Sequence, residues 1–209
     1  MVPSSLTGLR LHWSPKSPYV RKVMMCAMEL GLDEHLDLTR SVAAMLKPNA
    51  SLMRDNPLSK IPTLVRDDAE PLFDSRVICE YLNHCVHGQL FPQHGEARWQ
   101  ALRWQAFGDG LLDALILWRN EREREVPLEK LMEAFKVKVD ASLNLLESEA
   151  QALAQAPLHI GSISIACALG YMDYRFCGES WRQERPYLQA WHQHIAERTS
   201  YQKTQPIDG

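Results

Sequence analysis

The pattern of apolar and polar positions changes along the chain, and its first part predicts both strands and helices. Leu9–Trp13 alternates apolar with polar side chains, as a half-buried strand does. After a turn-forming cluster of Ser and Pro, apolar residues recur at helical spacing from Val20 to Leu30. Gly31 is a residue type that commonly follows a helix end. The first part therefore begins with a strand, a turn and a helix.

Shorter patterns complete this first part. They predict strands over 36–39, 61–65 and 71–73, a less regular helical stretch over 41–54, and a last helix after Ser75. The order is strand, helix, strand, helix, two strands and a final helix. It implies right-handed crossovers between the first three strands and a hairpin between the last two. This is the layout of an α/β thioredoxin-like domain.

The strand patterns end after residue 92, and the second part predicts helices alone. Aromatic and apolar residues at helical spacing predict a helix through 104–118, and further helices cover 128–154 and 160–176. Pro186 opens a final helix. The stretch 160–176 carries little charge, so we expect it to be the buried centre of an all-α bundle.

Length and composition agree with two domains. The chain has 209 residues, of which 45% are hydrophobic. This is enough apolar material for a substantial core, at a length where chains begin to divide into two. We expect a thioredoxin-like N-terminal domain in residues 1–88, a linker in 89–92, and an all-α helical-bundle C-terminal domain in 93–209.

Charge and cysteine usage exclude several classes of protein. The formal net charge of −3 lacks the basic excess of nucleic-acid-binding proteins. The sequence has no apolar run that could span a bilayer and no secretory signal pattern at its start. Five cysteines without a Cys-x-x-Cys pair or metal-ligand spacing indicate free thiols in a reducing compartment. We therefore expect a cytoplasmic protein without a metal, a nucleic-acid partner or a membrane.

Four segments carry the candidate chemistry: Ser17–Val23, Asn56–Leu64, Phe73–Ser75 and Ala168–Phe176. In this order and context they resemble motifs of the glutathione S-transferase family. The first segment is similar to the active-site turn of bacterial serine-type members and of the tau and zeta classes. The resemblance covers nearly the whole chain. It implies a thioredoxin-like glutathione-binding domain followed by an all-α domain on the electrophile-binding side.

The resemblance also implies an activity. A glutathione transferase activates the glutathione thiol as a thiolate for attack on small hydrophobic electrophiles, with glutathione as co-substrate. Family members usually form homodimers and serve detoxification. Glutathione-dependent isomerases and dehalogenases of this fold use the same thiolate and are one alternative. A non-catalytic binding or regulatory protein of the same fold is another, although the presence of Ser17, Asp74 and Ser75 favours an enzyme.

Ser17 is the candidate catalytic residue. It precedes Pro18 at a helix start, where Ser suits the N-cap and Pro the first turn. A simple cap would explain both residues. The resemblance implies that the Ser17 hydroxyl also donates a hydrogen bond to the glutathione thiolate, while glutathione itself is the nucleophile. Ser14, three residues earlier, is the alternative donor, because some related classes place their serine there.

The resemblance further assigns the groups that bind glutathione. The peptide bond before Pro62 would be cis, and the Ile61 backbone would pair with the cysteinyl part of glutathione. Ser75 and the free amides of its helix would receive the γ-glutamyl carboxylate, and Asp74 would pair with the ammonium. Lys47 is a candidate partner for the glycyl carboxylate, and a solvated surface lysine without a ligand is the alternative.

A pocket for the electrophile is expected between the two domains. Its candidate residues are Trp13, Trp104, Phe107 and Leu111. An aromatic stripe at this spacing is also what the core of a helical bundle requires, so both interpretations stay open.

Two motifs depart from the family pattern. Ser59 stands where the family has Gly before its third strand. His159 and Ser162 stand where the family has a Ser/Thr-x-x-Asp capping box at the start of the core helix. An imidazole offers at most one acceptor to the helix amides, so we expect a weak cap there.

Overall fold

The computed structural model describes residues 7–67 and 69–207. These residues form two compact units. The first runs to Gln93 and resumes at Lys203, and the second extends from His94 to Gln202. The expected domain bounds, residues 1–88 and 93–209, stay a prediction, and the first six and last two residues lie outside the described part.

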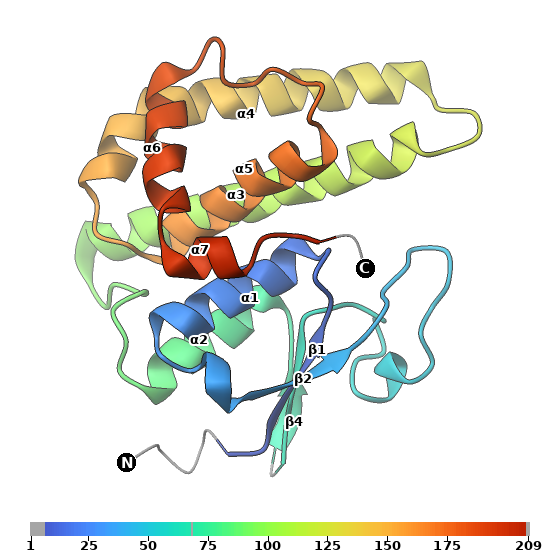
Figure 1. Ribbon diagram of the computed structural model, residues 1–209, viewed down its shortest axis with the longest axis vertical. Helices are drawn as coiled ribbons and strands as arrows, with labels where there is room; N and C mark the ends of the chain where they lie inside the picture. Colours follow the sequence, from blue (N-terminus) through green and yellow to red (C-terminus); the bar gives the residue numbers. More distant parts are fainter. Residues whose placement is uncertain (1–6, 68, 208–209) are drawn as a thin grey trace. The chain divides into compact units, whose positions relative to one another are not determined.

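A four-stranded sheet forms the centre of the first unit (Figure 1). Its strands are β1 (Leu9–Trp13), β2 (Leu36–Arg40), β3 (Thr63–Arg66) and β4 (Ala69–Leu72), in the order β2-β1-β3-β4. β2 is parallel to β1, whereas β3 is antiparallel to β1 and β4 is antiparallel to β3. The crossover between parallel strands and the final hairpin are therefore present. The expected crossover from the second strand to the third is wrong, because β3 reverses direction.

Two helices, α1 (Pro18–Glu29) and α2 (Ser75–Cys85), pack side by side in this unit (Figure 1). They bury apolar side chains such as Ile78, and β1 contributes Leu11 to the core. The predicted end of α1 is confirmed, because Gly31 follows it with φ +68°, a conformation that glycine adopts without strain.

The stretch 41–54 does not form the expected α-helix. Its helical part is one short 3₁₀ turn, η3 (Leu52–Arg54), and a similar turn, η2 (Asp33–His35), precedes β2. The Asn49 side-chain oxygen accepts hydrogen bonds from the amides two and three residues later, at 3.0 and 3.2 Å. Such local bonds compete with the backbone hydrogen bonds of a helix. Pro48 adds to this effect, because proline is poorly tolerated in a helix interior. Residues 41–59 therefore form an irregular connection, called here the β2–β3 segment.

The second unit is helical, as predicted. Its helices are α3 (Gly95–Arg122), α4 (Glu129–Gln155), α5 (Ile160–Arg175) and α6 (Pro186–Ala196). A short helix that the sequence pattern did not predict, α7 (Thr199–Lys203), follows them. None of the helices in the described part is long and apolar enough to cross a membrane.

α5 is the buried centre of this unit, which confirms the expectation from its low charge. Every residue from Ile160 to Met172 is buried. α3 approaches it closely where glycine leaves no side chain between the helices. A Cβ on Gly108 would lie 2.6 Å from the main-chain carbon of Ser164.

A polar network joins the end of α5 to the segment before α6. Asp173 accepts two hydrogen bonds from Arg182, both of 2.6 Å, and one from Trp181 Nε1 at 3.0 Å. Burial acts to raise the pKa of the Asp173 carboxyl, but the hydrogen bonds from Arg182 and Trp181 outweigh it, so this pKa lies below its usual value. Asp173 is therefore a charged anchor of the helical unit.

Candidate functional site

The strand register brings the segments predicted for the site to one end of the sheet. Trp13 at the end of β1 pairs with Arg40 at the end of β2. The end of β1 also lies beside Thr63, the first residue of β3. Leu72 at the end of β4 pairs with Leu64. The turn into α1, the β2–β3 segment, the start of β3 and the start of α2 therefore share this end.

Ser17 is the N-cap of α1. Its backbone is extended (φ −84°, ψ 119°), its Oγ accepts a hydrogen bond from the Val20 amide at 3.3 Å, and Pro18 is the first helical residue. This confirms the predicted cap. The bond uses a lone pair of the hydroxyl oxygen, so the hydroxyl hydrogen is not consumed by capping and can be donated to a ligand at the helix end.

Ser14 shapes the turn that leads into α1. Its Oγ accepts from the Lys16 amide at 3.4 Å, and its carbonyl accepts from the Ser17 amide at 3.3 Å. Both serines are half-buried. The choice of Ser17 over Ser14 as thiolate donor stays a prediction.

The turn before β3 has the geometry that the resemblance implies. The Ile61–Pro62 peptide bond is cis. Asn56 Nδ2 donates to the Lys60 carbonyl at 3.2 Å and to Thr63 Oγ1 at 2.9 Å, and Thr63 Oγ1 donates to the same carbonyl at 2.9 Å. Pro62, Asn56 and Thr63 are buried, so this network holds the turn beneath the half-buried Ile61.

Ser59, which replaces the family glycine, lies in the left-handed region with φ +52°. A residue with a Cβ is strained there. Its hydroxyl compensates in part, because it accepts a hydrogen bond from the Asn49 amide at 2.9 Å. Compared with the family glycine, Ser59 therefore strains the backbone and gains a hydrogen bond within the β2–β3 segment.

Asp74 is the N-cap of α2, and Ser75 is its first residue. Asp74 Oδ1 accepts from the Arg76 amide at 2.9 Å, yet 63% of its side chain is exposed. The Arg76 guanidinium lies 4.0 Å from Oδ2, and an exposed pair of this kind contributes little. Ser75 is buried. The Asp74 carboxylate is therefore accessible to a cation at the start of α2.

Lys47 lies in the β2–β3 segment and is exposed. Its backbone forms a bridge with Ala44, whose carbonyl accepts from the Lys47 amide at 3.2 Å. This small turn places the side chain on the surface of the segment that leaves the site end of β2.

A buried histidine that the sequence pattern did not single out lies beside these groups. His12 is only 2% exposed, although the alternation predicts a half-buried strand with its polar positions on the outer face. Its Nδ1 lies 2.7 Å from Ser41 Oγ and its Nε2 lies 2.8 Å from Asp55 Oδ2. A polar residue beside Trp13 in a strand was the available signal, but the partners that bury it are distant in sequence.

Comparison with known proteins decides the family. Models of the glutathione S-transferase N-terminal and C-terminal domains match residues 16–85 and 129–194. The chain belongs to the glutathione S-transferase family. A glutathione transferase family member from Pseudomonas fluorescens Pf-5, solved with bound glutathione, is 40% identical with a TM-score of 0.92. That match covers 96% of this chain and 100% of the other.

Two further relatives support the assignment. A glutathione S-transferase from Methylobacillus flagellatus, solved with glutathione bound, is 32% identical with a TM-score of 0.86, over 96% of this chain and 100% of that one. The uncharacterized GST-like protein YibF of Escherichia coli K12 is 29% identical over 95% of this chain and 98% of its own length.

The residues expected for the electrophile pocket differ in burial. Trp13 and Phe107 are half-buried, whereas Trp104 and Leu111 are almost completely buried. Trp104 Nε1 donates to Glu149 at 2.6 Å. The hydrogen bond from Arg103 lowers the pKa of Glu149 against the effect of burial, and the bond from Trp104 adds to this. Trp104 is therefore tied into the helical unit by its polar edge.

The departure from the family capping box has a defined structure. His159 Nδ1 accepts a hydrogen bond from the Ser162 amide at 3.1 Å, which confirms the single weak cap. The ring is 3% exposed and stacks on Trp104 with centroids 5.2 Å apart. Burial lowers the pKa of the His159 imidazole, because the charged form would lose its hydration. His159 Nε2 has no hydrogen-bond partner among the described residues.

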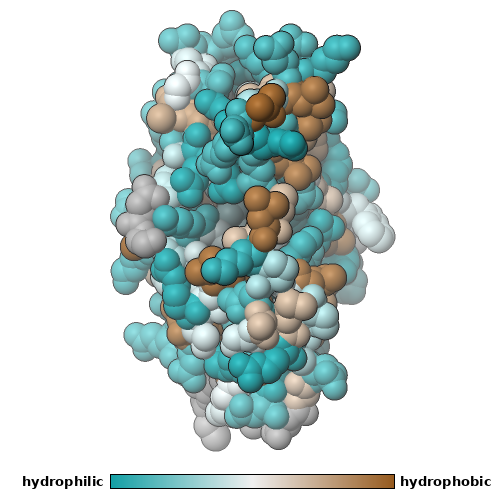
Figure 2. Space-filling view, turned by 90° about the vertical axis from the view of Figure 1, so that its right-hand side faces the viewer, coloured by the Kyte–Doolittle hydropathy of each residue, from teal (hydrophilic) through white to brown (hydrophobic). Residues whose placement is uncertain are grey.

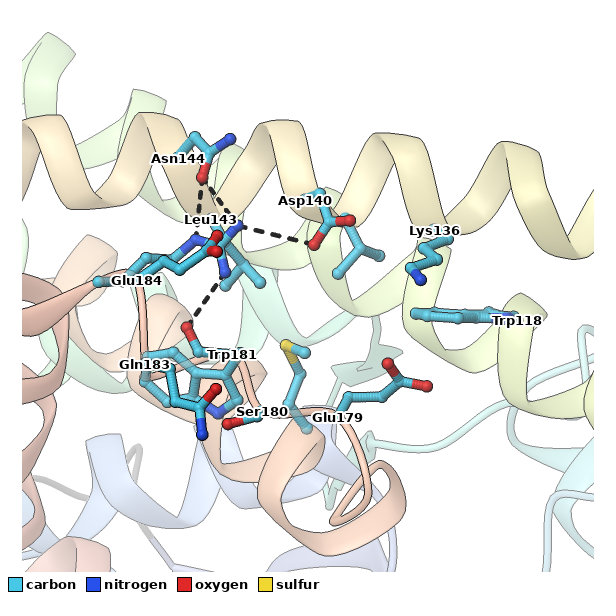
Figure 3. Close-up of a pocket in the computed structure, with 13 residues that line it drawn as sticks. Trp118, Lys136, Asp140, Leu143, Asn144, Glu179, Ser180, Trp181, Gln183 and Glu184 are labelled. Carbon is cyan, nitrogen blue, oxygen red and sulfur yellow. Dashed lines mark hydrogen bonds and ion pairs between the residues drawn. The ribbon is translucent and has the colours of Figure 1, made fainter.

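A cavity of about 350 Å³ lies within the helical unit, among residues of α3, α4, α5 and the segment before α6 (Figure 3). Arg185 is buried in its wall. Its guanidinium donates to Asn144 at 2.7 and 3.0 Å and to the Trp181 carbonyl at 3.1 Å, and it lies 3.6 Å from Asp140. These bonds join α4 to the start of α6. None of the residues predicted for the glutathione site lines this cavity.

Metal ligands are not grouped in the part of the chain that the structure describes. Within residues 7–67 and 69–207, no three His, Cys, Asp or Glu side chains lie together in a way that could hold an ion.

Proposed function

We propose that this chain is a glutathione transferase in which the Ser17 hydroxyl donates a hydrogen bond to the thiolate of bound glutathione. The observation that carries the proposal is the meeting of Ser17, Ile61, Asp74 and Ser75 at one end of the sheet. Family membership and the glutathione bound to two relatives support the same ligand.

The dimensions of the sheet suit an extended tripeptide. Neighbouring strands lie about 4.8 Å apart, so the ends of β1, β3 and β4 together span about 10 Å. An extended chain of three residues has a length of about 10 Å. Glutathione laid across the strand ends would place its cysteinyl part near Ser17 and the Ile61 backbone. Its γ-glutamyl part would then reach Asp74 and Ser75.

The charged ends of glutathione find complementary groups in this orientation. The γ-glutamyl carboxylate would lie at the positive N-terminal end of α2, beside the Ser75 hydroxyl. Its ammonium would pair with the accessible Asp74 carboxylate. The glycyl carboxylate would point towards the β2–β3 segment, where Lys47 is exposed. In this orientation the glycyl, cysteinyl and γ-glutamyl parts of glutathione would follow the order of the strands, from the β2 side of the sheet to β4.

The Ser17 position can supply the energy that thiol activation requires. Lowering a thiol pKa from about 8.5 by about two units needs roughly 2.7 kcal/mol. A hydrogen bond to a charged group contributes roughly 1.5–3 kcal/mol, and the positive end of α1 adds about 0.3–1 kcal/mol. Ser17 keeps its proton throughout, and the glutathione thiol releases its own proton to solvent. The sulfur then forms the new bond while the electrophile either breaks a π bond and takes up a proton, or expels its leaving group.

For the electrophile, Trp13 and Phe107 are the accessible candidate contacts, and Trp104 and Leu111 would act through packing. Conjugation to a small hydrophobic electrophile is the reaction that we propose. It needs neither a metal nor a nucleic acid, and it fits the cytoplasm, where thiols are kept reduced.

The proposal is tested with the purified full-length chain. We expect retention on glutathione-agarose, elution by free glutathione, saturable binding by calorimetry, and turnover with at least one member of a panel of small electrophiles. Binding without turnover across conjugation, isomerisation and dehalogenation substrates would favour a non-catalytic family member. Absence of binding would reject the glutathione site.

We also propose that the chain forms a homodimer. On the face shown in Figure 2, apolar side chains lie scattered among hydrophilic ones. In the first unit, exposed apolar residues gather in the β2–β3 segment: Val42, Met45, Leu46, Met53 and Leu58. Exposed apolar groups of this kind are often covered by a partner. Light scattering at micromolar concentration should give twice the chain mass, and a monomer mass would contradict the proposal.

A further inference from the structure

His12 connects the sheet to both ends of the β2–β3 segment. Its Nδ1 lies 2.7 Å from Oγ of Ser41, the first residue of the segment. Its Nε2 lies 2.8 Å from Oδ2 of Asp55, which follows η3 near the end of the segment. The ring is 2% exposed, so water has little access to either ring nitrogen, although 25% of the Asp55 side chain is exposed.

The β2–β3 segment depends on such bonds because it has little regular structure of its own. It contains one 3₁₀ turn and one isolated bridge in place of an α-helix. Asn49 organises its middle through bonds to Val42 and to Ser59. These bonds lie within the segment, whereas those of His12 fix it to β1. The Ser41 amide adds one backbone bond to the Trp13 carbonyl at 2.8 Å.

The network is complete in both charge states of the ring. Because the Asp55 carboxylate accepts, Nε2 of His12 carries a proton and donates. In the neutral ring, the Ser41 hydroxyl donates to Nδ1. In the imidazolium, Nδ1 donates to Ser41 Oγ, and the hydroxyl turns to the Thr39 carbonyl at 3.4 Å. Arg10 also lies 3.5 Å from Asp55 Oδ2 and pairs with this carboxylate.

We propose that His12 is a positioning residue for glutathione binding, which acts through Ser41 and Asp55 on the β2–β3 segment. The inference rests on the proposed function, because this segment carries Lys47 and leads directly into the Ile61–Pro62 turn. His12 does not touch the ligand. It holds the segment in its binding arrangement before glutathione arrives. Binding therefore does not have to order the segment, and the affinity for glutathione is higher.

Two conservative substitutions separate the two bonds. A glutamine amide ends about where Nε2 of histidine lies, so His12→Gln keeps the hydrogen bond to Asp55 and loses the hydrogen bond to Ser41. An asparagine amide ends about where Nδ1 lies, so His12→Asn keeps the hydrogen bond to Ser41 and loses the hydrogen bond to Asp55. We expect each to raise the dissociation constant and the KM for glutathione about fivefold, that is by about 1 kcal/mol, with kcat at saturation unchanged within about twofold.

Two companion measurements tie the effect to the segment. Adding Ser41→Ala to His12→Gln should change glutathione binding no further, because the bond between these residues is already lost. Hydrogen exchange of the full-length chain should accelerate in residues 42–59 of both His12 variants and stay unchanged in α1 and α2. Cys26→Ala, a buried change in α1, is the control for a general loss of stability.

The outcomes distinguish this inference from the proposed function. If the wild type does not bind glutathione, the proposed function fails and the inference fails with it. If the wild type binds and the His12 variants bind equally well, only the positioning role is overturned. A fall in kcat at unchanged KM, or an equal loss of affinity in Cys26→Ala, also overturns it. Should either His12 variant fail to fold, Ser41→Ala alone carries the same expectation of about fivefold weaker binding.

Discussion

Helix starts in the two units use the same local chemistry in opposite surroundings. In the first unit, Ser17 and Asp74 cap α1 and α2 while their side chains remain half-buried or exposed. In the second unit, His159 caps α5 with a ring that is 3% exposed. The accessible caps keep hydrogen-bonding capacity for a ligand, whereas the ring of the buried cap is closed off from solvent. Burial, more than residue type, decides what an N-cap can do.

The largest effect is expected at Ser17. Glycine is nearly as good an N-cap as serine but has no hydroxyl, so Ser17→Gly removes the thiolate donor and leaves the cap almost intact. We expect kcat/KM to fall roughly ten- to hundredfold, with the free energy of unfolding changed by only a few tenths of a kcal/mol. Steady-state kinetics and urea denaturation measure the two quantities.

Two variants sharpen the result at Ser17. Ser17→Ala should lose the same activity and also about 1 kcal/mol of stability, because it removes the cap as well. It should also raise the pKa of the glutathione thiol in the complex. Ser14→Ala is the matched control in the same turn. Full activity in Ser17→Gly together with an inactive Ser14→Ala would transfer the role to Ser14.

The next effect is expected at Asp74. Asparagine caps a helix as well as aspartate does, so Asp74→Asn removes the charge but keeps the bond to the Arg76 amide. The ammonium of glutathione then loses its ionic partner, and we expect about tenfold weaker binding by calorimetry with little change in stability. Asp74→Ala should lose both affinity and stability. Equal dissociation constants for wild type and Asp74→Asn would reject the assignment.

The buried cap predicts an effect on stability that depends on pH. Burial lowers the pKa of His159 in the folded state, so the unfolded chain binds the proton more readily. The stability from the neutral ring is complete above the unfolded pKa of about 6.5 and is lost as the pH falls below it towards the folded pKa. Replacing His159 by Thr and Ser162 by Asp introduces a capping box that does not titrate in this range.

The double variant should therefore gain more stability near pH 5.5 than at pH 8. At pH 8 the new capping box adds about 1 kcal/mol to the free energy of unfolding, and the loss of the His159 ring that stacks on Trp104 offsets part of this gain. Urea denaturation of both proteins at the two pH values measures the difference. His159→Asn, which keeps one acceptor without titrating, is the control. A gain that is the same at both pH values would show that His159 protonation does not limit stability.

The smallest effect is expected at Ser59, which lies in the β2–β3 segment away from both kinds of cap. Ser59→Gly relieves the left-handed backbone but loses the hydroxyl bond to the Asn49 amide. Since each contribution is about 1 kcal/mol, we expect a net change in unfolding free energy within about 0.5 kcal/mol. A loss above about 2 kcal/mol would show that the hydroxyl bond organises the whole segment.

Much of the fold and several features of the site could be predicted from neighbouring residues. Periodicity indicated β1, α1 and the buried α5, and Ser17 and His159 were predicted as caps because capping acts within three or four residues. The expectation failed over 41–54, where helical spacing of apolar residues was outweighed by the side-chain bonds of Asn49 and by Pro48. The predicted crossover from the second strand to the third was wrong, because the direction of a strand depends on which strand it pairs with.

The sequence by itself determined the local chemistry of this protein: which residues cap helices, where glycine ends α1, and which motifs belong to the family. The tertiary structure decided how those groups are used. His12 bonds to residues 29 and 43 positions away, and that separation leaves no periodic trace in the sequence. The accessibility of Asp74 and the burial of His159 likewise depend on what packs around each helix start. Burial and long-range pairing are properties of the folded chain, because they arise when distant segments exclude water from the same place.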